Sequence, residues 1–176
     1  MNTAMTKKEI TINLVMSEIV YDVQNKTYLT GRSRQSADNH EAVANMQAND
    51  DEEDKNQVLR SIGNAFGTLK TKLSEYLVSD KTSSNNVQID EDTNLEVTLQ
   101  MPSNYNPATV DTISAALHQY IVNTAIAEWF NITNKGDAQE YATLSTGNLG
   151  LVREAINKRV RPQRPKVNEE GTGTGD

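Results

Sequence analysis

The residues that could perform acid–base, nucleophilic or metal chemistry are few, and their spacing forms no recognised catalytic motif. His40 and His118 are the histidines, and neither has a second histidine or a carboxylate at metal-ligand spacing. No serine lies in a Gly-x-Ser-x-Gly elbow, and the chain has no cysteine. We therefore expect no enzyme activity, no cofactor and no metal, and we expect His118 to be a partly buried structural residue on a helix.

Neither of the two glycine-rich stretches has the context of a phosphate-binding loop. The sequence GNAFG (63–67) lies inside a predicted helix and lacks a following Lys-Ser or Lys-Thr pair. The sequence GTGTG (171–175) has no strand before it. We do not expect nucleotide binding through a glycine-rich loop.

Acidic residues gather in one segment of the chain. Residues 37–54 contain seven Asp or Glu and no Lys or Arg, which equals the net charge of −7 for the whole chain. The run Asp50–Asp54 lacks the alternating ligand spacing of a calcium loop, so a bound cation is not favoured there. Because acids interact favourably with the N-terminal end of a helix dipole, the simplest interpretation is a solvent-exposed helix start.

Basic residues gather near the C-terminus. Between Leu151 and Lys166 there are six Lys or Arg against Glu154 alone, and the prolines in this stretch exclude helix and favour an extended backbone. We expect an arm that binds a neighbouring protein, formed by Arg159, Arg161, Pro162, Arg164, Pro165 and Lys166. The alternative is a nucleic-acid-binding accessory protein whose arm contacts phosphates, although the acidic chain as a whole argues against a general nucleic-acid binder.

The elements that position these groups follow from hydrophobic periodicity, which predicts an α+β fold that is mainly α. Three longer helices are expected over residues 51–78, 107–131 and 137–160, with strands over 10–16 and 95–101 in a small antiparallel sheet. The last two helices form a C-terminal helical hairpin. We expect a flexible N-terminus (1–8), one domain (9–160), and an extended basic arm with a disordered tail (161–176).

Weaker signals predict the remaining segments. A short helix is expected over Ser17–Thr30, with Ser17 as its N-cap and Gly31 just beyond its end. Residues 33–49 are expected to be an exposed excursion or a weak helix. Further expectations are a short partner strand at Val87 and Ile89 and a turn over residues 131–136.

The hairpin carries the apolar residues that should hold it together. Its first helix has a wide apolar surface, which indicates contacts on more than one side. The second helix has Tyr141, Leu144, Asn148, Val152, Ala155 and Ile156 at core spacing. We expect Trp129, Phe130 and Tyr141 to lie in the core or at an interface between subunits.

Nothing in the sequence predicts insertion into a membrane. No apolar run approaches the roughly 18 residues of a membrane span, and the N-terminus lacks the hydrophobic stretch of a signal peptide. We expect a soluble protein that acts where it is made.

Several short motifs occur in a fixed order along the chain. They are KTYLTGR (Lys26–Arg32), MPSNYN (Met101–Asn106), AEWF (Ala127–Phe130), TNK (Thr133–Lys135) and RVRP (Arg159–Pro162). Over roughly residues 9–165 this order resembles small virion proteins of tailed phages and prophages of gut bacteria, including crAss-like phages. The helical hairpin with its trailing basic arm is similar to the head-to-tail connector, also called adaptor or ring protein.

The resemblance implies a structural virion protein made in the host cytoplasm and incorporated at the phage neck. Such proteins form an oligomeric ring, often of twelve copies, that joins capsid to tail and encloses the DNA channel. The implied partners are other copies, the portal protein and tail or other ring proteins, with no membrane and no sequence-specific DNA contact. In such a ring Asp50, Asp51, Glu52 and Glu53 would face the channel, where negative charge keeps passing DNA from adhering. A tail terminator or another tail-completion protein is the alternative role.

Overall fold

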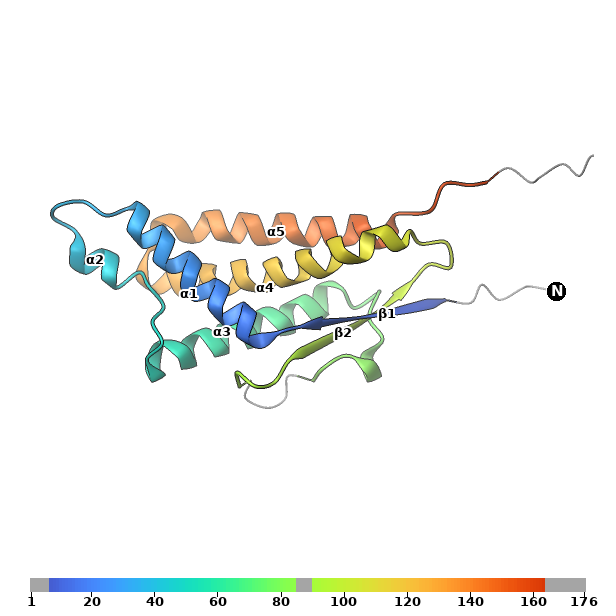
Figure 1. Ribbon diagram of the computed structural model, residues 1–176, viewed down its shortest axis with the longest axis horizontal. Coiled ribbons are helices and arrows are strands. Elements are labelled where there is room, and N and C mark those ends of the chain that lie inside the picture. The colour runs from blue at the N-terminus through green and yellow to red at the C-terminus, as the bar shows by residue number, and fades with distance from the viewer. Residues whose placement is uncertain (1–6, 85–89, 164–176) are drawn as a thin grey trace, which may run out of the picture.

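The fold is described by a computed structural model that covers residues 7–84 and 90–163 (Figure 1). Within these residues the elements are β1 (Lys8–Leu14), α1 (Met16–Ser33), α2 (His40–Ala44), α3 (Glu52–Lys72), β2 (Leu95–Met101), α4 (Val110–Thr133) and α5 (Lys135–Asn157), with 3₁₀ turns η1 (Ser79–Lys81) and η2 (Pro107–Thr109). The protein is therefore α+β and mainly α, as its periodicity predicts. The expected strand at Val87 and Ile89 and the expected tail from residue 164 onward lie outside the described residues.

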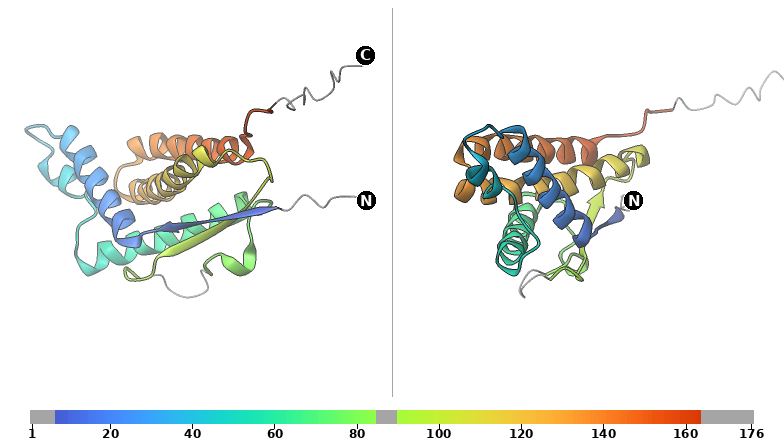
Figure 2. Two further views of the ribbon diagram at one scale, coloured as in Figure 1. Left: turned by 45° about the vertical axis from the view of Figure 1, so that its right-hand side comes forward. Right: turned by 60° about the vertical axis from the view of Figure 1, so that its left-hand side comes forward.

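Helix α4 lies at the centre of the fold. Twelve of its residues are buried and they lie all around the helix, which is the pattern of a helix covered on several sides. Helices α5, α3 and α1 and strand β1 all contact it. Figure 2 shows α4 between α5 on one side and α3 with the sheet on the other. The prediction that this helix makes contacts on more than one side is confirmed.

The two strands form the predicted antiparallel sheet. Lys8 lies opposite Met101 at one end and Leu14 opposite Leu95 at the other, so β1 already begins within the N-terminus that was expected to be flexible. Thr98 is buried although strand alternation would expose it. The reason is that residues 77–83 run along β2, where Val78 N–H donates to the Thr98 carbonyl at 2.9 Å and Thr98 Oγ1 donates to the Lys81 carbonyl at 3.0 Å.

The same segment explains why α3 ends at Lys72 and not near residue 78 as predicted. Leu77 continues the helical spacing of apolar residues, but it forms a β-bridge with Leu99. Beside it, Gln100 N–H donates to the Tyr76 carbonyl at 2.6 Å. An open strand edge carries backbone groups that need partners, and the chain leaves the helix to provide them.

Helix α1 extends beyond both of its predicted ends. It begins at Met16 because the side chain of Asn94, just before β2, accepts the Met16 N–H at 3.1 Å, so the expected Ser17 cap is wrong. Gly31 lies inside the helix and is buried. A Cβ at Gly31 would approach the Val43 carbonyl oxygen to 3.2 Å, so glycine permits the close packing of α2 against α1.

Residues 33–49 contain the short helix α2 and contribute to the core. Val43, Met46 and Ala48 are buried, so the segment is not merely an exposed excursion. The backbone N–H of Ala48 donates to Thr27 Oγ1 at 3.1 Å, and Thr27 is fully buried in α1. This hydrogen bond fixes the end of the segment against α1.

The hairpin is tighter than predicted. Helices α4 and α5 are separated by Asn134 alone, so the expected turn over 131–136 is mostly helical. Asn106 caps the first turn of η2 by accepting the Ala108 N–H at 3.1 Å, and Pro107 follows it, as the start signal predicts. On α5 the predicted core position Leu144 is 48% exposed, whereas Leu149, which is not among the predicted core positions, is buried.

Candidate functional site

The aromatic residues of the hairpin join it to the N-terminal half of the chain. Trp129 is buried, and its Nε1 donates to the Met46 carbonyl at 2.9 Å. Phe130 is fully buried and packs edge-on against Tyr141, with ring centroids 5.4 Å apart. The Tyr141 hydroxyl is 2.8 Å from Thr30 Oγ1 on α1. The structure therefore places Trp129 and Phe130 in the core of the chain itself, and Tyr141 half-buried at its edge.

A two-point ion pair ties the end of α1 to the start of α5. Arg34 Nη2 donates to Asp137 Oδ1 at 2.6 Å and Arg34 Nε donates to Asp137 Oδ2 at 3.2 Å. Asn134 Nδ2 donates to the same Oδ2 at 2.5 Å. The hydrogen bond from Arg34 lowers the pKa of the Asp137 carboxyl below its ordinary value; burial opposes the lowering and the Asn134 hydrogen bond adds to it.

We expect the substitution Asp137→Asn to make stability less dependent on acid pH. Because the folded-state pKa of Asp137 lies below the unfolded value near 3.8, its contribution is present above that value and is lost as pH falls through the folded pKa. The variant should therefore have a lower urea midpoint than wild type at pH 7, and the difference should shrink toward pH 2. Asp38→Asn, at an exposed acid, is the control; a difference for Asp137→Asn that stays constant with pH would contradict the assignment.

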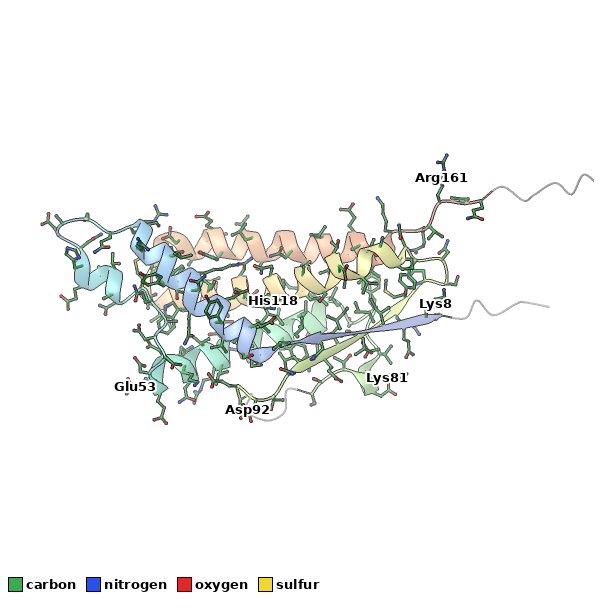
Figure 3. All side chains as sticks on the ribbon, viewed as in Figure 1. Lys8, Glu53, Lys81, Asp92, His118 and Arg161 are labelled. Atoms are coloured by element: carbon green, nitrogen blue, oxygen red, sulfur yellow. The ribbon has the colours of Figure 1, made fainter. Side chains whose placement is uncertain are left out.

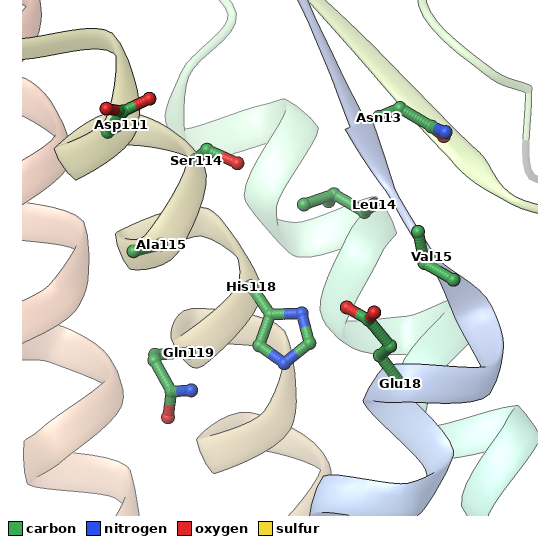
Figure 4. A pocket seen from close by; sticks show the side chains of 9 residues that line it. All are labelled: Asn13, Leu14, Val15, Glu18, Asp111, Ser114, Ala115, His118 and Gln119. Carbon is green, nitrogen blue, oxygen red and sulfur yellow. The ribbon is translucent and has the colours of Figure 1, made fainter.

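A pocket of about 340 Å³ lies between the N-terminal end of α1 and the N-terminal half of α4 (Figure 4). His118 and Glu18 face each other across it, and Asp111 and Ser114 line it further along α4. His118 is also paired with Asp22 of α1, which does not line the pocket, with Nε2 2.8 Å from Oδ2. Spacing in the sequence gave no sign of this partner, because 96 residues separate the two.

A second polar contact lies beside this pair at the interface of α1 and α4. Lys26 Nζ donates to Gln119 Oε1 at 2.5 Å and to Asn123 Oδ1 at 3.3 Å. Burial lowers the pKa of Lys26, and the nearby charge of Asp22 opposes the lowering. Together the two contacts join the helices through hydrogen bonds, so His118 has a structural role here.

The pocket contains a serine and a histidine, Ser114 and His118, which are residue types found in nucleophilic catalysis. His118 with Asp22 could accept a proton, and Ser114 lies one turn before His118 on α4. Within the described residues no hydrogen bond joins the Ser114 hydroxyl to His118, and such a bond is the usual sign of an activated nucleophile. Residues 7–84 and 90–163 also contain no group of three His, Asp or Glu arranged to hold a metal ion.

The acidic residues lie at the start of α3. Asp51 is the N-cap, and its Oδ1 accepts the Asp54 N–H at 3.0 Å, while Asp54 Oδ2 accepts the Asn49 N–H at 3.0 Å. All four of Asp50, Asp51, Glu52 and Glu53 are exposed.

A pocket of about 570 Å³ opens between this helix start and the last turns of α4. Asp51 and Glu53 line it at the start of α3, while Trp129, Ile132 and Thr133 line it from the end of α4. Ile132 is 67% exposed although it is a large apolar residue. The pocket therefore combines an uncovered apolar side chain with negative charge, a pairing that no spacing in the sequence indicated. We call it the α3–α4 pocket.

The base of the basic arm is fixed to the body. Asn106 N–H donates to the Lys158 carbonyl at 3.0 Å, and Val160 N–H donates to the Asn104 carbonyl at 3.0 Å. Beyond these two hydrogen bonds the chain leads away from the helices (Figure 1). The side chains of Val160 and Arg161 are exposed. Arg159 donates through Nη1 to the Ile156 carbonyl at 3.3 Å. Pro162 also lies in the described part of the arm, whereas Arg164, Pro165 and Lys166 lie outside the described residues.

The arm and the acidic residues are not brought together within one chain. Figure 3 shows Arg161 and Glu53 toward opposite ends of the long direction of the molecule. The site defined by the geometry is therefore a pair of separated surfaces, one basic and projecting, the other acidic and hollow.

Comparison of the chain with protein-family models, with curated proteins and with solved structures finds no match. Among the described helices, none combines the length and the apolar character that crossing a bilayer requires.

Proposed function

We propose that this protein is a subunit of an oligomeric ring in the neck of a tailed phage particle, where it joins capsid to tail and surrounds the DNA channel. The observation that carries the proposal is the basic arm. Its base is held by two backbone hydrogen bonds to residues 104–106, so the exposed Val160 and Arg161 are presented away from their own domain. An arm presented in this way is suited to a neighbouring protein, and its partners are other copies, the portal protein and tail proteins.

Exposed apolar side chains on the helices support assembly into a larger particle. Five large apolar side chains on two helices are each more than 40% exposed: Tyr21, Tyr28 and Leu29 on α1, and Leu144 and Leu151 on α5. Leu144 and Leu151 are seven residues apart, so they lie on one face of α5. Large apolar side chains grouped on a surface favour contact with other proteins.

The proposal is tested by measuring particle mass. We expect the purified chain, alone or mixed with a portal protein, to give a ring-sized species. A chain truncated after Val160 keeps both backbone hydrogen bonds at the base of the arm but loses Arg161 and the residues that follow. It should unfold at the wild-type temperature and fail to assemble. Normal assembly of this truncation into infectious particles would contradict the role of the arm.

The nucleic-acid alternative gives a different result in the same preparation. Arg161 is exposed and the sequence continues with Arg164 and Lys166, so phosphate binding by the arm is chemically feasible. A nucleic-acid-binding protein would bind free DNA with an affinity that falls steeply as salt is raised. A connector subunit should show little binding to free DNA at physiological salt.

A further inference from the structure

We propose that the α3–α4 pocket receives the C-terminal arm of a second copy of this chain, so that subunits join head to tail. This inference rests on the proposed ring function and names the contact between neighbouring subunits. The occupant is the first part of the arm, which carries Val160 and Arg161.

The first argument is the chemistry of the pocket. Its volume is about 570 Å³ and its wall holds Ile132, which is 67% exposed. Covering this exposed apolar side chain is favourable, because it removes apolar area from water. Asp51 and Glu53, at the start of α3, also line the pocket. An occupant that fits must therefore carry an apolar group next to a positive charge.

The second argument is that the arm carries this pair of groups. Val160 is 45% exposed and precedes the exposed Arg161. An arginine can contact a carboxylate through two parallel hydrogen bonds, which fixes orientation as well as charge. Pro162 restricts the backbone after Arg161, so less conformational entropy is lost when the arm is bound.

The third argument is the placement of the two surfaces. Arg161 and Glu53 lie toward opposite ends of the molecule (Figure 3). Two backbone hydrogen bonds to residues 104–106 hold the base of the arm in place. The arm of one chain is thus directed to a neighbour and not to its own pocket. A contact between two different surfaces of identical chains is heterologous, and it generates a closed ring when the rotation between subunits closes.

The test is a charge exchange in the full chain, followed by sedimentation velocity over a range of concentrations. Arg161→Glu and Glu53→Arg should each weaken self-association about tenfold or more, since truncating or reversing one partner of an interface charge pair raises the dissociation rate. The double variant should regain most of the lost affinity. Ile132→Ser should also weaken association, without lowering the unfolding temperature, because Ile132 is exposed in the single chain.

Matched controls separate the contact from general electrostatics. Glu52→Arg reverses an exposed acid in the same first turn of α3 that does not line the pocket. Arg60→Glu reverses an exposed base on the same helix. Both should associate as wild type does.

For a chain that self-associates, three results would overturn the inference. They are wild-type association of both reversals, failure of the double variant to recover, and a map of the assembled ring in which Glu53 faces the DNA channel. None of these three results contradicts the proposed ring function. A wild-type chain that stays monomeric also overturns the head-to-tail contact, and the proposed function is then judged separately by mixing the chain with the portal protein.

Discussion

Trp129→Ala is expected to lower the free energy of unfolding by about 3 to 5 kcal/mol, the range for removing a buried aromatic side chain. Trp129 is 6% exposed and lies near the end of α4, where it contacts the segment after α2. The substitution removes the apolar ring and also leaves the Met46 carbonyl without its donor. Chemical denaturation of the purified chain measures the loss.

Two further variants separate the contributions of Trp129. Trp129→Phe keeps most of the apolar ring but not the Nε1 donor, so it should cost about 1 to 2 kcal/mol, the scale of one buried hydrogen bond. Ile132→Ala, three residues further along and exposed, should stay within about 0.5 kcal/mol of wild type. If Trp129→Ala abolished assembly while leaving stability unchanged, Trp129 would belong to an interface and not to the core.

Thr27→Val is expected to lower the free energy of unfolding by about 1 to 3 kcal/mol, because it leaves a buried donor unsatisfied. Thr27 is fully buried, donates through Oγ1 to the Gln24 carbonyl at 2.9 Å and accepts the Ala48 N–H at 3.1 Å. Valine has nearly the same shape, so packing is retained while the acceptor is lost. Urea denaturation gives the energy, and hydrogen exchange at the Ala48 amide should become faster.

The control for this variant is Thr71→Val on α3. Thr71 is exposed and its Oγ1 donates to the Gly67 carbonyl at 3.2 Å, without accepting a buried donor. We expect a change within about 0.5 kcal/mol. Equal effects of the two substitutions would show that the Ala48 hydrogen bond does not stabilise the segment after α2.

The candidate surfaces were only partly predictable. The acidic segment and the basic arm are visible as charge runs, because local composition alone defines them. The α3–α4 pocket was not predicted, since it depends on α4 ending beside the start of α3, about 80 residues away in the sequence. The exposure of Ile132 is decided in the same way: its spacing on α4 does not tell which side of the last turn remains uncovered.

Local periodicity was sufficient to determine both strands and the existence of the long helices, because a period of 2 or 3.6 is set by which side chains can reach a common core. Asn106-Pro107 likewise marks a helix start through its own backbone and side-chain chemistry. What only the tertiary structure decided are the contacts between distant residues. Asn94 caps α1, Leu77 leaves the helical pattern to pair with Leu99, and Asp22 binds His118. Each of these satisfies a polar or backbone group with a partner that folding, and not spacing along the chain, brings within reach.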